Sequence, residues 1–282
     1  MSEKHVDKNK NNYLKNVKSK FILKRIFDNL KKTKFLNTIR YNKTIQNKLN
    51  KDIKDYMKLY SKIKIEIIPA KNMYGKFINF PDKTPYYQIY FNDNKNEIKR
   101  TYITKDDKVT KIKIIFYNES KSFCKLFGDC ICIQKLNFVK IRSERISDMS
   151  FMFSGCASLE EINFSNFNTN NAIDISYMFN ACFKLKNINV SNFNTSNVNN
   201  MRYMFSMCYQ LKELNLSNFN TNKVNNMSYM FSHCFSLQNL NISNFSTNED
   251  TNKDKMFLEC KELEKINCSD EFIISQFQSI MK

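Results

Sequence analysis

The apolar positions of this 282-residue sequence recur with a period of 26 residues. A variant, Leu-Phe-Gly-Asp-Cys at residues 126–130, stands one period before the first full copy of the motif Met-Phe-x-x-Cys. A fixed period of this length is typical of solenoids, in which each unit buries its apolar face only against its neighbours. The sequence therefore predicts a solenoid. The full copies of the motif are Met152–Cys156, Met178–Cys182, Met204–Cys208, Met230–Cys234 and Met256–Cys260.

The apolar period changes within each repeat. In the copy that begins at Met227, apolar residues fall at i, i+3, i+4 and i+7, which predicts one face of a short helix. Leu237, Leu240 and Ile242 follow, and the last two alternate with an outward-facing asparagine as residues of a strand do. Each unit is therefore predicted to contain a short helix, a strand and a loop.

The strand phrase Leu-x-x-Leu-x-Leu reads LEEINF, LKNINV, LKELNL, LQNLNI and LEKINC, with IQKLNF before them. The whole unit, MSYMFSxCxxLxxLNLSNFNT, resembles the BspA-like leucine-rich repeat of bacterial and protist surface proteins. This resemblance covers about residues 126–268 and continues weakly upstream at Val109–Ile114. It implies a curved solenoid with strands on its concave side, used for binding or adhesion, and it implies no enzymatic activity.

We accordingly expect an α/β fold, a right-handed leucine-rich-repeat solenoid of about six to seven units. Four regions are predicted: a basic helical segment over 1–62, a β-rich cap over 63–108, the solenoid over 109–268 and a capping helix over 269–282. The cap and the terminal helix would cover the apolar ends of the solenoid, because the first and last repeats have no neighbour on one side.

Residues 13–60 carry amphipathic helical patterns with two interpretations. An apolar helix face is most often packed against a neighbour. Alternatively, Phe21–Leu49 resembles an F-box-like segment, which implies docking to an adaptor of ubiquitin ligases. The candidate partner-binding residues on these helices are Ile22, Ile26, Phe27 and Leu30.

The net charge of +18 is concentrated in the N-terminal half of the chain. Residues 1–60 carry 17 Lys/Arg against 5 Asp/Glu, whereas residues 126–268 carry 13 of each. Such a basic half suits nucleic acid or an acidic membrane, but lysine-rich solvated helix faces are the simpler explanation, and we do not expect a nucleic-acid partner. The sequence has no apolar run of about 18 residues and begins without a secretory-type apolar region, so we expect no membrane span and a cytoplasmic location. The family resemblance leaves surface exposure open.

Six of the nine cysteines form one column in the repeat. A buried cysteine behaves as a small apolar residue, and the total is odd, so we expect reduced packing residues rather than disulfides. Zinc sites normally need close cysteine pairs such as Cys-x-x-Cys, which the chain lacks, and we expect no metal and no cofactor. The column consists of Cys130, Cys156, Cys182, Cys208, Cys234 and Cys260.

The sequence shows no recognisable set of catalytic residues. The two histidines, His5 and His233, have no recognisable partners, and the three glycines form no phosphate-binding loop. We therefore predict that the protein is not an enzyme and assign no catalytic residue.

The candidate ligand-binding residues are the strand positions that lie between buried ones and so face outward. An asparagine is constant in every repeat, which favours a scaffold role through stacked side-chain amides, whereas the flanking positions vary in charge. Mixed charge favours a protein ligand over a nucleic acid, whose phosphates prefer a uniformly basic surface. The twelve candidates are Glu160, Glu161, Asn163, Lys186, Asn187, Asn189, Lys212, Glu213, Asn215, Gln238, Asn239 and Asn241.

Three functions remain open from the sequence. The first is a non-enzymatic scaffold that binds a protein ligand on the concave face. The others are an F-box-like substrate receptor of a ubiquitin ligase and a surface adhesion protein.

Overall fold

A computed structural model describes residues 62–80, 87–117, 121–141 and 145–280, together with the single positions Ile22, Thr44 and Asn47. The chain divides into two compact units, Met1–Lys62 and Ile63–Lys282. In the first unit the three single positions are helical, and Ile22 is 51% exposed. The other candidate adaptor-binding residues, Ile26, Phe27 and Leu30, lie outside the described residues, as does most of the predicted helical segment.

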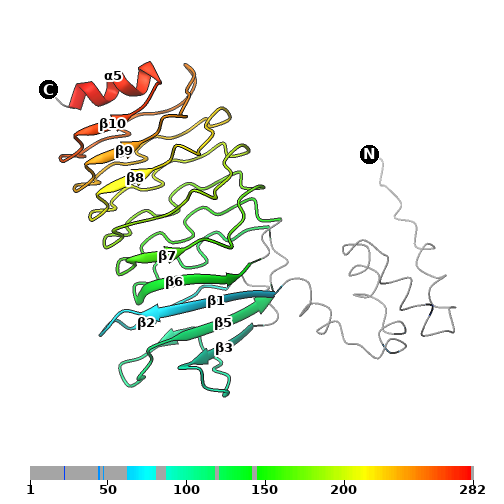
Figure 1. The fold of residues 1–282 in the computed structure, drawn as a ribbon. Helices are drawn as coiled ribbons and strands as arrows, with labels where there is room; N and C mark the ends of the chain where they lie inside the picture. Colours follow the sequence, from blue (N-terminus) through cyan, green and yellow to red (C-terminus); the bar gives the residue numbers. More distant parts are fainter. Residues whose placement is uncertain are drawn as a thin grey trace, which may run out of the picture. The chain divides into compact units, whose positions relative to one another are not determined.

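The second unit begins with a mixed sheet whose strands follow the order β3-β5-β1-β6-β7 (Figure 1). β1 pairs antiparallel with β6, β3 pairs antiparallel with β5, and β6 pairs parallel with β7. Alternate residues of β1, including Ile63, Ile65 and Ile67, are buried, as a sheet with one face on the core requires. The strands are β1 (Lys62–Pro69), β3 (Tyr87–Phe91), β5 (Ile112–Tyr117), β6 (Ile133–Lys140) and β7 (Glu161–Asn163).

The prediction that Val109–Ile114 forms the first solenoid strand is wrong. The second half of that segment, from Ile112, belongs to β5, which pairs antiparallel with β3. β1 lies between β5 and β6 and occupies the edge of β6 where an earlier repeat would pair. The parallel stacking of repeats therefore begins at β6.

Further along the chain, three parallel strands form a second sheet in the order β10-β9-β8. Equivalent residues pair across it, for example Leu214 with Leu240 and Leu240 with Ile266. The elements are β8 (Glu213–Asn215), β9 (Asn239–Asn241), β10 (Lys265–Asn267) and, after them, the helix α5 (Glu271–Ile280). A small antiparallel pair, β2 (Gly75–Lys76) and β4 (Tyr102–Ile103), lies within the N-terminal part of this unit.

The segment of each repeat that was predicted to be a short helix is a pair of successive turns. The N–H of Met152 donates to the carbonyl of Met149 at 3.3 Å, but the N–H of Met149 donates to Asp174 in the next repeat at 2.9 Å. Phe151 and Gly155 have φ angles of 56° and 74°, in the left-handed region. An α-helix needs a negative φ at every residue, so this backbone cannot be helical.

The same geometry recurs in the following repeats, with left-handed residues at Tyr177 and Ala181, then at Tyr203 and Met207. The prediction of an α/β unit with a helix in every repeat is therefore corrected to repeats of strands and turns. Within the described residues of the second unit, α5 is the one α-helix, and it lies near the C-terminus as the sequence predicts.

The core of the repeats is a set of aligned columns. Phe153 and Phe179 stack with ring centroids 5.6 Å apart and planes within 1°, and Phe127 through Phe257 continue this column. The cysteine column is buried, as predicted, and all nine cysteines are free. Each thiol from Cys156 to Cys260 donates to the carbonyl of a phenylalanine 29 residues earlier; the Cys182–Phe153 bond measures 3.3 Å. Burial raises the pKa of Cys260 to about 12.

A second aromatic column is half-buried on the outside of the turns. Tyr203 stacks on Tyr177 at 4.8 Å and on Tyr229 at 4.5 Å. Lys255 places its ammonium 5.7 Å from the centroid of the Tyr229 ring at one end of this stack. Every tyrosine in the column has a left-handed φ, so stacking between repeats accompanies a strained backbone at each step.

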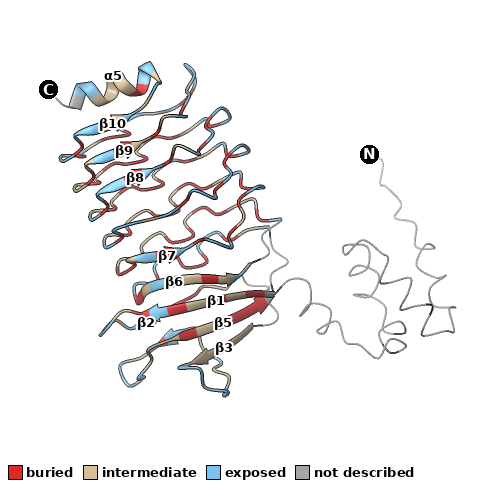
Figure 2. Ribbon diagram, viewed as in Figure 1, coloured by how far each residue is buried: buried red, intermediate tan, exposed pale blue. Residues whose placement is uncertain are grey.

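Helix α5 closes the last repeat. Asp270 accepts the N–H of Ile273 at 3.0 Å, as an N-terminal cap does, and accepts the N–H of Thr247 at 2.7 Å. Ile273 is fully buried, and Phe277 packs edge-on against Phe257. Figure 2 shows how burial is distributed along the repeats: β7 to β10 carry exposed residues, and other segments of each repeat carry the buried ones.

Candidate functional site

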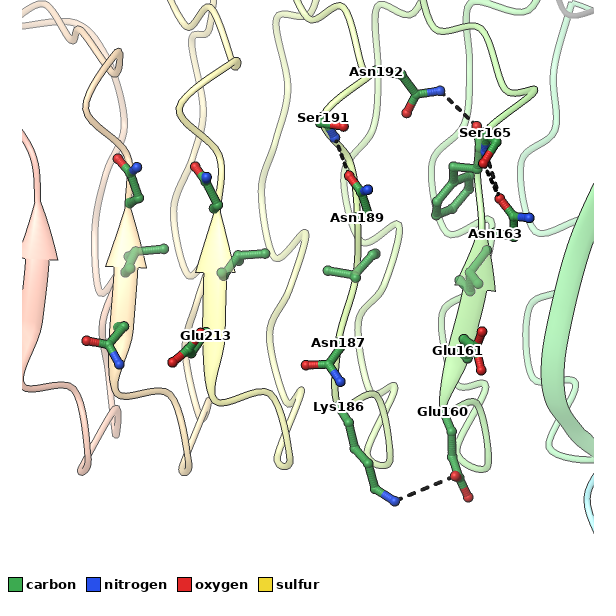
Figure 3. A pocket seen from close by; sticks show the side chains of 18 of the residues that line it. Glu160, Glu161, Asn163, Ser165, Lys186, Asn187, Asn189, Ser191, Asn192 and Glu213 are labelled. Carbon is green, nitrogen blue, oxygen red and sulfur yellow. Dashed lines mark hydrogen bonds and ion pairs between the residues drawn. The ribbon is translucent and has the colours of Figure 1, made fainter.

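A groove of about 1050 Å³ runs along the strand face of the repeats. It is lined by residues 160–165, which include β7, by residues 186–189, 191 and 192, by β8 and β9, and by Lys135, Lys265 and Asn267 (Figure 3). β7 and β8 bury their central apolar residues, Ile162 and Leu214, and expose the residues on both sides of them. This alternation places one row of side chains level with Glu161 and a second row level with Asn163.

Ten of the twelve residues predicted from the sequence line this groove. Lys212 and Gln238 do not: Lys212 is exposed outside the lining, and the Gln238 amide donates to Glu262 at 3.3 Å. The ten are Glu160, Glu161, Asn163, Lys186, Asn187, Asn189, Glu213, Asn215, Asn239 and Asn241.

The sequence prediction missed lining residues at both ends of the groove. Lys135 pairs in register with Glu161, and Lys265 pairs in register with Asn239. Their distance of 26 residues from those partners is the signal that would have found them. Ser165, Ser191 and Asn192 also line the groove, just after the strand positions.

The constant asparagine column stabilises turns at the ends of the strands. The Oδ1 atom of Asn163 accepts the N–H of Ser165 at 2.9 Å, and that of Asn215 accepts the N–H of Ser217 at 3.0 Å. This local bond is the usual reason for asparagine in a turn. The constant asparagine therefore has a scaffold role within its own turn, and amide stacking between repeats stays a prediction.

A different asparagine joins the repeats. Asn192 donates its amide hydrogens to the carbonyls of Phe164 at 2.8 Å and Phe167 at 3.0 Å in the preceding repeat. Asn218 makes the equivalent bonds to Val190 and Phe193. This column was not predicted from the sequence, although its asparagine is the middle residue of every Ser-Asn-Phe triplet.

Ion pairs neutralise the charges at the β6–β7 end of the groove. Lys135 lies 2.7 Å from Glu161, and Lys186 lies 3.6 Å from Glu160, toward which Figure 3 shows it pointing. The hydrogen bond from Gln134 at 3.2 Å, followed by the charge of Lys186, holds the pKa of Glu160 below its ordinary value. This end therefore presents little net charge to a ligand.

The β8–β10 end of the groove presents charges without partners. Neither Glu213 nor Lys265 forms an ion pair or a side-chain hydrogen bond within the described residues, and both are exposed. Asn187 and Asn239, which flank Glu213 in the same row, also lack side-chain partners in this part of the chain. These groups are available to a ligand.

The strand ladder is interrupted in the middle of the groove. β7 pairs with β6 and β8 pairs with β9, but residues 186–189 between them make no backbone–backbone hydrogen bond in the described structure. Ile188 is only half-buried, whereas its counterparts Ile162 and Leu214 are buried. Unpaired backbone groups at a surface are satisfied by water or by a bound partner. The 186–189 segment therefore adds donors and acceptors to the groove floor.

The repeat region matches a known protein family. A family described as "Mycoplasma protein of unknown function, DUF285" matches residues 90–187, 121–215 and 182–277. The overlapping matches together cover more than half of the chain. The protein belongs to the DUF285 family. No match was found among curated proteins or among solved structures.

Within the described ranges, no three His, Cys, Asp or Glu side chains gather closely enough to hold a metal ion. In the same part of the chain, no helix is both long enough and apolar enough to cross a membrane.

Proposed function

We propose that this DUF285 protein is a non-enzymatic scaffold that binds a protein ligand in the strand-face groove. The observation that carries the proposal is the contrast between the core and the groove. Leu or Ile recurs beneath the groove in every repeat, whereas the outward residue before it changes from Glu161 to Asn187, Glu213, Asn239 and Lys265. A solenoid that varies one face over a constant core suits recognition of an extended surface.

The character of the lining supports a protein ligand over a polyanion. Carboxylates, ammonium groups and amides alternate along the groove, so a nucleic acid would meet the carboxylates of Glu161 and Glu213 as well as lysines. A protein surface offers both signs of charge together with peptide groups. The lining also holds no close set of acid, base and nucleophile, which supports binding without chemistry.

The BspA-like resemblance of the repeats supports a related proposal, adhesion at a cell surface, in which the same groove would bind its ligand outside the cell. The ligase-receptor alternative depends on Ile22, Ile26, Phe27 and Leu30, and it remains a prediction from the sequence. A pull-down with the Ile26→Asp variant tests it, because only this alternative requires an adaptor that the variant loses.

Site-specific photo-crosslinking tests the scaffold proposal. A photoreactive amino acid is placed at Asn187 in the groove of the full-length chain, and a matched one at Asn222, which is exposed outside the lining. We expect the Asn187 position to give a discrete protein adduct that mass spectrometry identifies, and the Asn222 position to give none. Equal adducts from both positions, or none from Asn187, would count against the groove.

A further inference from the structure

The groove carries two exposed charges of opposite sign that the protein itself leaves unpaired. Glu213 on β8 and Lys265 on β10 have no ionic partner within the described chain, in contrast to Glu160, which lies 3.6 Å from Lys186. Exposed lysines and glutamates are common, but these two stand in one row of a continuous groove. The row is therefore negatively charged at β8 and positively charged at β10.

The register of the strands fixes the separation of the two charges. Glu213 pairs with Asn239, and Asn239 pairs with Lys265, so one strand separates the charges. Neighbouring strands lie about 4.8 Å apart, which puts the two positions roughly 10 Å from each other along the solenoid. In the second row, Asn215 pairs directly with Asn241, so these two residues are one strand spacing apart.

We infer that this end of the groove binds an extended peptide segment that carries one basic and one acidic side chain. The basic group lies over Glu213 and the acidic group lies over Lys265. This inference rests on the proposed function and names the chemistry of its ligand. Residues two apart in an extended chain point to the same side and lie about 7 Å apart, and the long side chains of lysine and glutamate span the remaining distance to groove charges that lie roughly 10 Å apart.

The groups between the charges suit a peptide backbone. The Asn239 side chain offers one acceptor and two donors without partners in the described structure, which is the complement of a peptide N–H and C=O. The Asn215 and Asn241 amide nitrogens are likewise unused within it, since only their oxygens bond to the turns. An extended peptide can satisfy this row through its main chain while its side chains reach the charges.

The same lining is less suited to other elongated ligands. Its one aromatic residue, Phe164, is buried, so no ring is exposed for a sugar to stack on. A neutral oligosaccharide would also leave Glu213 and Lys265 without counter-charges. A polyanion would be repelled at Glu213.

Fluorescence anisotropy with three synthetic peptides and the full-length protein tests the inference. The peptides share one Ser/Thr background and differ at two positions two residues apart, whose side chains point to the same side of an extended chain and which hold Lys and Glu, two Lys, or two Glu. We expect the wild-type protein to prefer the mixed peptide, Glu213→Lys to prefer the doubly acidic one, and Lys265→Glu to prefer the doubly basic one. Because exposed pairs are weak, each preference should be about three- to tenfold and should shrink with added salt.

Lys212→Glu is the matched control for Lys265→Glu, because it makes the same change from lysine to glutamate. Lys212 directly precedes Glu213 in the sequence but lies outside the groove lining. The Lys212→Glu variant should keep the wild-type preference. Glu213→Gln and Lys265→Gln serve if a charge reversal fails to fold. Glu213→Gln should remove the preference for the mixed over the doubly acidic peptide, and Lys265→Gln the preference for the mixed over the doubly basic peptide.

The inference is overturned if wild-type protein binds no peptide, binds the three alike, or prefers a neutral oligosaccharide, or if the variants keep the wild-type order. A protein adduct at Asn187 together with any of these results would reject the charge pattern and leave the scaffold function standing. Absence of both the adduct and the peptide preference would reject both.

Discussion

The thiol of Cys208 donates a hydrogen bond to the carbonyl oxygen of Phe179, at an Sγ–O distance of 3.3 Å. Cys208 belongs to one repeat and Phe179 to the repeat before it, so the bond crosses the interface between units. The column cysteines on either side, Cys182 and Cys234, make the same bond at 3.3 and 3.1 Å. The recurring cysteine therefore bonds the repeats together as well as filling a packing position.

Replacing Cys208 with alanine should lower the free energy of unfolding by about 1–2 kcal/mol, because a buried hydrogen bond and a sulfur atom's packing are lost. Urea denaturation measures the change. Cys124→Ala is the control, since Cys124 is exposed, and it should change stability by less than about 0.5 kcal/mol. Similar losses in the two variants would show that the column bond contributes nothing specific.

The same column predicts a loss of stability at alkaline pH. Thiols in the unfolded chain ionise near their ordinary pKa of 9.0, whereas burial raises the pKa of Cys260 to about 12. Between these values the unfolded state releases protons that the folded state retains, so the stabilisation is complete below about pH 9 and is lost as pH rises toward 12. The urea midpoint should fall across this window, and Cys260→Ala should reduce the slope. A Cys260→Ala slope equal to that of the wild type would contradict the assignment.

Glycine substitutions distinguish turns from helices in the repeats. Ala181 has a φ of 57°, where glycine is favoured, so Ala181→Gly should raise the free energy of unfolding by about 0.5–1 kcal/mol. In a helix the same change would lower it by about 1 kcal/mol. Ala157→Gly, at a position without a left-handed φ, should be destabilising. Thermal or urea unfolding gives the sign of the stability change. A destabilising Ala181→Gly would contradict the turns and favour a helix in this segment.

The failure to predict these turns has a physical cause. Met149, Met152, Phe153 and Cys156 are buried at the spacing of a helix face, because two successive turns direct the same positions inward. Apart from Gly155, the left-handed positions from Phe151 to Glu259 hold phenylalanine, tyrosine, lysine, alanine, methionine, histidine or glutamate rather than the glycine and asparagine that usually mark such a backbone. The hydrophobic pattern therefore predicted burial correctly but could not distinguish the two backbones.

The groove was more predictable than the turns, because strand alternation decides which side chains face outward. That rule located Glu161 and Asn163 without a structure, and the 26-residue period would have extended it to Lys135 and Lys265. The unpaired 186–189 segment had no such signal, since LKNINV has the same length and apolar pattern as LKELNL. Backbone hydrogen bonding of residues 186–189 depends on how neighbouring repeats fit together, and the sequence of a single repeat does not determine that fit.

Two lysines in successive repeats give a matched test of the groove. Lys186 lines it and Lys212, at the equivalent position one repeat later, does not. Lys186→Glu should weaken binding of the crosslinked partner by about three- to tenfold, since it also places two carboxylates side by side at Glu160. Lys212→Glu should leave the dissociation constant unchanged. Calorimetric titration measures both, and equal effects would place the ligand elsewhere.

Hydrogen exchange of the 186–189 segment is the most direct test that the groove is the binding surface. In the free protein these amides should exchange fast, because they have no backbone hydrogen-bond acceptor, while the amides of β9 exchange slowly. Addition of the partner identified by crosslinking should slow exchange at residues 186–189. Protection confined to other regions, with unchanged fast exchange in this segment, would contradict a ligand in the groove.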